Sequence, residues 1–219
     1  VYFPQWEVVG DIGNALWQMT ECITPQNWDS NYALRIKAEL FEKMSGEMNE
    51  ISFPLKPQSI VKTVREILPR DGILSLDNGM YKLWFARYFR TYERNTILLD
   101  NALATMGAGL PGGIAAKLVN PEKKVIVVVG DGGFMMNSQE LETALRLKLD
   151  LVILILNDNG YGMIKWKQES QKMQDFGLSF SNPDFVKYAE SYGAHGYRVT
   201  ETVSLKSLLE KTLSLSGIH

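Results

Sequence analysis

Two acidic residues in this sequence are flanked by glycine or asparagine, and each follows a short apolar run. Asp131 stands in Gly130-Asp131-Gly132-Gly133 after the run 125–129, and Asp158 stands in Asn157-Asp158-Asn159-Gly160 after the run 151–156. If both runs are strands of one parallel sheet, adjacent loops bring the two carboxylates within reach of one divalent cation such as Mg²⁺. Gly132 and Gly133 leave backbone N–H groups open to a diphosphate, and the N-terminus of the following helix favours negative charge. These residues predict a site that binds a diphosphate through a metal ion.

A turn is the simpler interpretation of either motif, because both compositions are common in turns. Their joint occurrence after two apolar runs, with one helix between them, favours a ligand site. Other nucleotide motifs are missing: there is no Gly-x-x-x-x-Gly-Lys-Ser/Thr. The string Gly107-Ala108-Gly109-x-x-Gly112 lies inside a helical pattern, so its glycines are predicted to allow close helix packing. No Cys/His set has zinc spacing, and His195 is interpreted as an ordinary strand-edge histidine.

The segments that must position these motifs alternate between short apolar runs and amphipathic stretches. We expect strands at 73–77, 96–99, 124–129, 151–156 and 197–199, and helices at 60–68 (capped by Ser59), 83–89, 106–118, 138–148, 183–192 and 205–215. This alternation predicts an α/β fold, a parallel sheet with helices on both faces.

The N-terminal part has a different pattern. Residues 7–11 predict a short strand, followed by a helix from 14 to 21. From 24 to 57 the sequence is irregular and polar, with an amphipathic stretch at 34–41, and Pro54 and Pro57 predict a domain boundary near residue 55.

The composition excludes several classes of protein. The chain has 219 residues, 45% hydrophobic and 22% charged, which excludes a disordered protein. A net charge of −2 gives no reason to expect a nucleic acid or an anionic membrane as partner, and no apolar run approaches the roughly 18 residues of a membrane helix. The single cysteine, Cys22, excludes a disulfide framework and fits a reducing cytosol. The first residue is not Met, and the last helical pattern stops where a further strand is due, so a fragment of a longer polypeptide is expected.

Three stretches of the sequence resemble the thiamine diphosphate-dependent acetolactate synthase (acetohydroxyacid synthase) family, and its catabolic members in particular. They are Thr105-Met106-Gly107-Ala108-Gly109-Leu110-Pro111, Gly130-Asp131-Gly132-Gly133-Phe134-Met135 and Asn157-Asp158-Asn159-Gly160-Tyr161-Gly162-Met163. The resemblance covers nearly all of 57–219 and implies a C-terminal diphosphate-binding (PP) domain there, truncated before its last strand. It implies that 1–22 is the tail of a central domain and that 23–56 is a linker.

The resemblance also implies roles for individual residues. Asp131 and Asp158 would bind Mg²⁺ through their side chains, and Gly160 through its carbonyl oxygen; many relatives have Asn where this chain has Asp158. Met106 would support the bent conformation of the cofactor, although a core methionine on a helix is the alternative. The implied cofactor-binding set is Asn78, Gly79, Met80, Tyr81, Met106, Gly130, Gly132, Gly133, Asn159, Tyr161, Gly162 and Met163.

The implied activity belongs to the full-length protein. It would decarboxylate pyruvate and ligate the hydroxyethyl group to a second 2-oxo acid, as in branched-chain amino acid biosynthesis, in a cytoplasmic homodimer or homotetramer. The glutamate that activates the cofactor is expected in a separate N-terminal domain of the partner subunit, so these 219 residues are expected to be inactive alone. The resemblance also allows FAD in the full-length protein. The alternatives are another thiamine diphosphate-dependent 2-oxo acid decarboxylase or carboligase (benzoylformate, indolepyruvate or glyoxylate type) and a non-catalytic α/β binding module.

Overall fold

The computed structural model describes residues 3–24, 26, 29–49 and 52–219, which form two compact units, 1–42 and 43–219. In the first unit, helix α1 (Ile12–Cys22) begins after Asp11, whose side chain accepts a hydrogen bond from the Asn14 N–H.

The strand predicted at 7–11 is wrong: its described residues have no strand partner, and an isolated strand leaves its backbone groups unpaired. Helix α2 (Asn31–Met48) lies within the predicted linker and includes the division between the units. The domain assignment itself stays a prediction.

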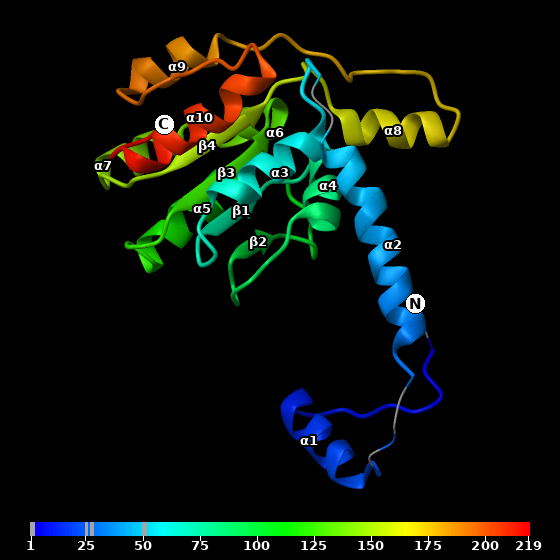
Figure 1. The fold of residues 1–219 in the computed structure, drawn as a ribbon. Helices are drawn as coiled ribbons and strands as arrows, with labels where there is room; N and C mark the ends of the chain where they lie inside the picture. The colour runs from blue at the N-terminus through cyan, green and yellow to red at the C-terminus, as the bar shows by residue number, and fades with distance from the viewer. Residues whose placement is uncertain (1–2, 25, 27–28, 50–51) are drawn as a thin grey trace. The chain divides into compact units, whose positions relative to one another are not determined.

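The second unit is built on four parallel strands in the order β2-β1-β3-β4 (Figure 1). They are β1 (Ile73–Leu76), β2 (Ile97–Leu99), β3 (Val125–Gly130) and β4 (Val152–Leu156). Leu76 pairs with Val128, and Gly130 pairs with Leu156, so the strands end together at one edge. β1 is buried along its whole length and β3 up to its final glycine, because helices cover both faces of the sheet.

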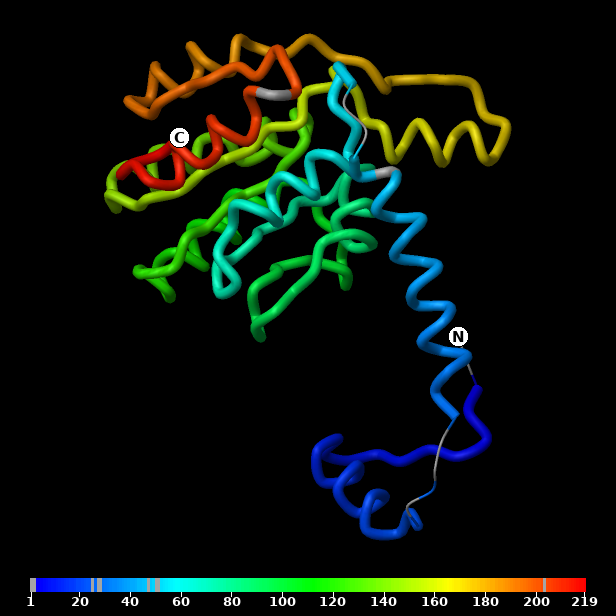
Figure 2. Tube along the Cα trace, in the orientation of Figure 1, coloured from blue at the N-terminus to red at the C-terminus, as the bar shows by residue number. Residues whose placement is uncertain are grey.

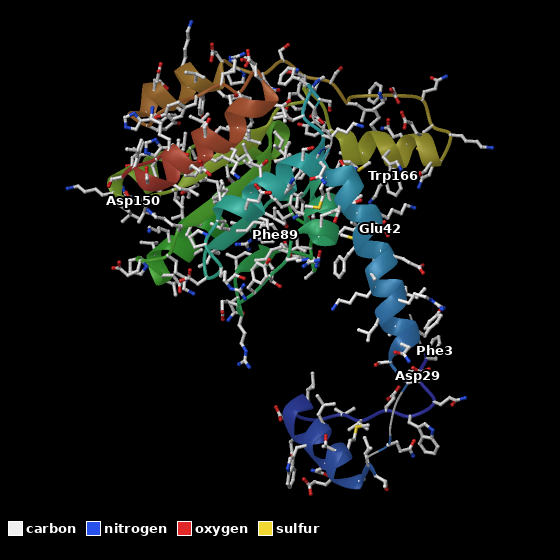
Figure 3. The ribbon with its side chains drawn as sticks, viewed as in Figure 1. Phe3, Asp29, Glu42, Phe89, Asp150 and Trp166 are labelled. Atoms are coloured by element: carbon white, nitrogen blue, oxygen red, sulfur yellow. The ribbon has the colours of Figure 1, made fainter. Side chains whose placement is uncertain are left out.

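Each face of the sheet carries its own set of helices (Figures 1 and 2). Each face also has its own cluster of buried hydrophobic side chains. Helices α3 (Pro57–Ile67), α4 (Tyr81–Tyr88) and α10 (Thr202–Ser214) cover one face, where Phe89 joins the buried cluster (Figure 3). Helices α5 (Gly109–Val119), α6 (Asp131–Met136), α7 (Glu140–Arg146) and α9 (Phe185–Tyr192) cover the other. Helix α8 (Gly162–Ser170) has no buried residue, and its Trp166 is 50% exposed (Figure 3). In the described part of the chain, no helix is long and apolar enough to span a membrane.

The predicted α/β fold is confirmed, and the four strands expected at 73–77, 96–99, 124–129 and 151–156 all form. The strand expected at 197–199 does not form. The start of β4 pairs with the C-terminal residues instead: Leu151 forms a parallel bridge with Ile218, and the Ile153 N–H donates to the His219 carbonyl at 2.8 Å. Strand propensity alone does not place a segment in a sheet, because the backbone groups of a neighbouring strand must also be available.

Several helix boundaries differ from the prediction, and three of the differences have a local cause. Ser59 is not a cap: helix α3 begins at Pro57, whose fixed φ suits the first turn, and Ser59 is buried inside the helix. Helix α5 begins at Gly109 instead of residue 106, after Gly107 with its φ of +85°. The helix expected at 138–148 forms as the shorter α7, and an additional helix that was not predicted, α6, precedes it, with the non-helical residues 137–139 between the two.

Candidate metal and diphosphate site

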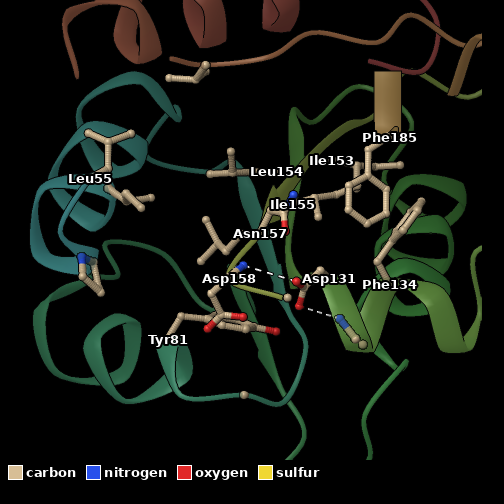
Figure 4. A pocket seen from close by; sticks show the side chains of 18 of the residues that line it. Leu55, Tyr81, Asp131, Phe134, Ile153, Leu154, Ile155, Asn157, Asp158 and Phe185 are labelled. Atoms are coloured by element: carbon tan, nitrogen blue, oxygen red, sulfur yellow. Dashed lines mark hydrogen bonds between the residues drawn. The ribbon is translucent and has the colours of Figure 1, made fainter. Parts of the chain in front are cut away.

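The carboxylate of Asp131 is buried at the end of β3 and is held by four N–H donors. Its Oδ1 accepts the Gly132 N–H at 2.7 Å. Its Oδ2 accepts the N–H groups of Asn159 at 2.7 Å and Asp158 at 3.2 Å, and the side-chain amide of Asn182 at 2.6 Å. Figure 4 shows Asp131 beside Asp158, across the ends of two neighbouring strands. The side chain is 1% exposed, so this network fixes the direction in which the carboxylate points.

Asp158 lies in the exposed loop after β4, next to Asp131 (Figure 4). Removal of water from the carboxyl raises the pKa of Asp158, the charge of Asp131 raises it further, and the Gly160 N–H opposes both effects. A divalent cation between the two carboxylates would supply the positive charge that this arrangement needs. Across the described residues, no group of three or more His, Cys, Asp or Glu could hold a metal. A cation here would therefore take its other ligands from carbonyl, phosphate or water oxygens, as Mg²⁺ commonly does.

A pocket of about 1130 Å³ opens at this edge of the sheet (Figure 4). It brings together nearly all residues that the sequence predicted for the metal and the cofactor: Asn78, Gly79, Met80, Tyr81, Met106, Gly130, Asp131, Gly132, Gly133, Asp158, Gly160, Tyr161, Gly162 and Met163. Asn159 is predicted but does not line the pocket. It has a left-handed φ of +57°, and its side-chain oxygen accepts from Asn182 at 3.0 Å. Its side chain thus bonds to Asn182 beside the loop after β4, and its role in cofactor binding stays a prediction.

The N–H of Gly132 is not open in the way the sequence suggested, because it donates to Asp131. Two aromatic rings, Tyr161 and Phe180, lie 4.8 Å apart over this glycine. A Cβ on Gly132 would come within 2.7 Å of Tyr161 and 3.2 Å of Phe180. Glycine is thus required here by the rings that close over the loop.

Tyr81 contributes a buried hydroxyl group to the pocket. Its ring packs on two glycines: a Cβ would lie 2.5 Å from the ring at Gly79 and 3.1 Å from it at Gly130. The residue is 8% exposed, and its hydroxyl has no hydrogen-bond partner in the described part of the chain. Burial raises the pKa of Tyr81, and the nearby carboxylates raise it further, so the hydroxyl stays protonated and available as a donor to an anionic oxygen.

Asp77, at the end of β1, is a site residue that the sequence analysis missed. It is fully buried and accepts the N–H groups of Gly107 at 2.9 Å and Ala108 at 3.1 Å, which anchors the loop that carries Met106. Burial raises the pKa of its carboxyl. A Cβ on Gly133 would lie 2.2 Å from Asp77 Oδ2, so the glycine after the Asp131 loop makes room for this carboxylate. The sequence did contain a signal for Asp77, because this acid directly follows the strand-forming run 73–76. Asp131 follows the run 125–129 in a similar way, with one glycine between them.

Asn182 was missed as well, and no local signal marks it, since it lies 51 positions after Asp131. Two glycines of the 107–112 string, Gly109 and Gly112, lie in α5 and behave as expected, whereas Gly107 precedes the helix with a left-handed φ of +85°. A Cβ would lie 2.7 Å from Asp77 Cβ at Gly109 and 2.9 Å from Ser75 Oγ at Gly112. The prediction of close helix packing is confirmed for these two glycines.

The chain is similar to known proteins over nearly its whole length. Residues 77–218 match the family model described as thiamine pyrophosphate enzyme, C-terminal TPP binding domain. The chain is 35% identical to the catabolic acetolactate synthase of Raoultella terrigena and 33% identical to an acetolactate synthase of Bacillus subtilis (strain 168). Each alignment includes 99% of this chain, but 39% and 38% of the respective relative. The resemblance to acetolactate synthases, including the catabolic type, is confirmed.

A solved structure is also similar. It is a thiamine diphosphate-dependent 4-hydroxybenzoylformate decarboxylase of Rhodococcus jostii RHA1, with a TM-score of 0.70 and 26% sequence identity. The match covers 75% of this chain and 31% of the decarboxylase chain. The chain therefore spans between 31% and 39% of the length of these three relatives.

Proposed function

Because the chain belongs to the thiamine pyrophosphate enzyme family, whose C-terminal TPP-binding domain it matches over residues 77–218, we propose that its pocket holds the diphosphate of thiamine diphosphate through one Mg²⁺. Thiamine diphosphate is the cofactor of this family, with Mg²⁺ as the usual partner ion. The observation that carries the proposal is the pair Asp131 and Asp158, which lie side by side after adjacent parallel strands (Figure 4).

The residues at the pocket fit this cofactor in two respects. Two carboxylates beside carbonyl oxygens form the hard oxygen ligand set that Mg²⁺ prefers, with Gly160 as the proposed carbonyl ligand. The buried hydroxyl of Tyr81, which has no partner among the described residues, is a donor for a phosphate oxygen. Residues 78–81 line the same pocket as the Asp131 loop, so both segments are available to a bound diphosphate.

The proposed role of each residue follows from its place at the pocket. When bound, thiamine diphosphate supplies the carbon that adds to a 2-oxo acid and the ring that accepts its electron pair on decarboxylation. Asp131 and Asp158 would hold the metal. Asp77 fixes the backbone directly after Met106, through the N–H groups of Gly107 and Ala108, so that Met106 can support the rings of the cofactor. Tyr161 and Phe180 exclude water over Gly132.

For the full-length protein we propose an acetolactate synthase-type reaction: decarboxylation of pyruvate and ligation to a second 2-oxo acid. The support is the 33–35% identity to acetolactate synthases over nearly the whole chain. A cytoplasmic homodimer or homotetramer, with the activating glutamate supplied by another domain of the partner subunit, belongs to the same proposal. Steady-state consumption of pyruvate by the isolated 219 residues would contradict it.

A second candidate is a thiamine diphosphate-dependent 2-oxo acid decarboxylase, favoured by the similarity to the 4-hydroxybenzoylformate decarboxylase. Incubation of the full-length protein with pyruvate separates the two. Acetolactate as the main product supports the carboligase, and acetaldehyde without acetolactate supports a decarboxylase.

The metal–diphosphate site is tested by calorimetric titration of the chain with thiamine diphosphate, with and without Mg²⁺. We expect Mg²⁺-dependent binding that is lost in Asp131→Ala and kept in Asp71→Ala, which alters an exposed turn before β1. If Asp131→Ala binds as the unmodified chain does, the site assignment is wrong.

A further inference from the structure

Three oxygen atoms from two loops converge on the side-chain nitrogen of Asn182. Its amide lies 2.6 Å from Asp131 Oδ2, 2.9 Å from Asn157 Oδ1 and 3.0 Å from Asn159 Oδ1. One acceptor follows β3, and the other two stand on either side of Asp158 after β4. A single side chain therefore connects the two loops that carry the proposed metal ligands.

The donors on Asp131 are unequally divided between its two oxygens. Oδ2 receives three N–H donors, from Asp158, Asn159 and Asn182, whereas Oδ1 receives one, from Gly132. A carboxylate oxygen has about two lone-pair sites, so Oδ2 is saturated and Oδ1 keeps the capacity to bind a cation. Asn182 thus adds a side-chain donor to the oxygen that two backbone N–H groups also engage, which leaves Oδ1 as the oxygen available to a metal.

Asn182 is held in place by residues 178–181, which directly precede it. We call residues 178–182 the strap. Ser179 forms an antiparallel bridge with Gly160, and the Tyr161 N–H donates to the Leu178 carbonyl at 3.0 Å. Phe180 packs on the ring of Tyr161. After the strap, Asp184 accepts the N–H groups of Val186 and Lys187 at the start of α9. Figure 2 shows the path from α8 to α9 that includes the strap.

We propose that Asn182 is a positioning residue of the cation site: its amide binds Oδ2 of Asp131 and directs Oδ1 toward the metal. This inference rests on the proposed metal–diphosphate function. Groups behind a metal ligand that orient it typically change metal affinity about 10- to 100-fold when they are removed. The side-chain oxygen of Asn182 is buried without a partner among the described residues, so loss of this side chain removes an unsatisfied acceptor, which offsets part of the cost of removing the amide donor.

The experiment measures Mn²⁺ binding to the 219-residue chain in the presence of inorganic diphosphate, with free Mn²⁺ quantified by electron paramagnetic resonance. We expect the Mn²⁺ dissociation constant to rise about 10-fold or more in Asn182→Ala. Asn182→Asp keeps the shape but replaces the donor with a charge that repels Asp131, so its loss should equal or exceed that of Asn182→Ala. The control is Ser181→Ala, the exposed neighbour in the strap, which should bind as the unmodified chain does.

The order of the two variants distinguishes positioning from packing. If Asn182 only fills space, the isosteric Asp variant binds normally and the Ala variant alone is impaired, which overturns the inference. Affinities within twofold of the unmodified chain for both variants also overturn it. Thermal unfolding by circular dichroism identifies a variant that fails to fold, and the other variant then decides. If the unmodified chain itself binds no Mn²⁺ with diphosphate, the proposed function fails, and not the role of Asn182 alone.

Discussion

The loops after β3 and β4 both carry a proposed metal ligand, but they hold it in different ways. Asp131 is buried and its carboxylate accepts four N–H donors from three segments of the chain. Asp158 is exposed, and the main effects on its carboxyl are loss of water and the charge of Asp131, which both raise its pKa. One ligand is therefore fixed by the protein, whereas the other depends on a cation for its stabilisation.

This difference separates two tasks at a metal site. A preorganised ligand sets the geometry at no cost when the ion binds. For a ligand that is stabilised by the ion itself, part of the binding free energy of the ion offsets the unfavourable environment of the ligand's charge. Substitutions should affect the two loops in different proportions, and the following experiments test that contrast.

The largest effect is expected for Asp131→Asn. Both oxygens of Asp131 accept hydrogen bonds, but an Asn side chain has only one oxygen. Its NH₂ group would face N–H donors that a carboxylate oxygen of Asp131 now satisfies, so buried donors would lose their acceptor. We expect a loss of about 3 kcal/mol in the free energy of unfolding and no measurable Mg²⁺-dependent binding. Urea unfolding measures the first and calorimetry the second. A variant as stable as the unmodified chain would show that the Asp131 network is not preorganised.

Gly133→Ala should be the next most severe change. Its Cβ would lie 2.2 Å from Asp77 Oδ2, an atom held in place by the Gly107 N–H. We expect a cost of about 1–3 kcal/mol from this overpacking, measured by urea unfolding. The matched control in the other loop is Gly162→Ala, whose Cβ meets its nearest atoms at 3.6 Å and should change stability little. Equal stability of the two variants would remove the contrast between the loops.

Asp158→Asn is expected to have a moderate effect that is confined to binding. The amide keeps one oxygen for the metal and removes the repulsion from Asp131 that now raises the pKa of Asp158. The thiamine diphosphate affinity at saturating Mg²⁺ should fall by less than about 10-fold, and stability should be unchanged or slightly higher. Calorimetry and thermal unfolding measure these quantities. A loss of stability as large as that of Asp131→Asn would contradict the proposed asymmetry.

The smallest effect is expected far from both loops, at the pair Lys206 and Glu66, which joins α10 to α3 at 2.9 Å. Lys206→Ala should lower Tm by less than about 2 °C, because exposed ion pairs contribute little. The hydrogen bond from Lys206 lowers the pKa of Glu66 below its ordinary value of 4.5. The pair therefore stabilises the fold above pH 4.5, and this contribution is lost as the pH falls through the lower folded-state pKa. If the Tm of the unmodified chain and that of Lys206→Ala still differ at pH 2, the difference does not come from the ion pair with Glu66.

Much of the fold followed from local patterns. The apolar runs at 125–129 and 151–156 are strands because short, wholly apolar segments must be covered on both faces, and that requirement is visible in the residue types. The two acidic loops were predicted for the same reason, since parallel strands bring their carboxyl ends to one edge. Pairing was less predictable. The segment 197–199 has strand-forming residues but no place beside β4, where Gly217 and His219 bond to Leu151.

Local residue patterns were sufficient to predict the α/β class, the four strands of the sheet and the acids at their ends, because residue spacing and apolar periodicity act over a few neighbouring positions. How those acids are held depends on contacts that form only in the folded chain. Asp77 faces Gly133, and Asn182 reaches Asp131 from 51 positions away. Such partners come together only after the loops close, and a hydrogen bond between distant segments leaves no periodic signal in the chain. The residues that could bind a metal were thus visible in the sequence, whereas the residues that orient them became visible in the fold.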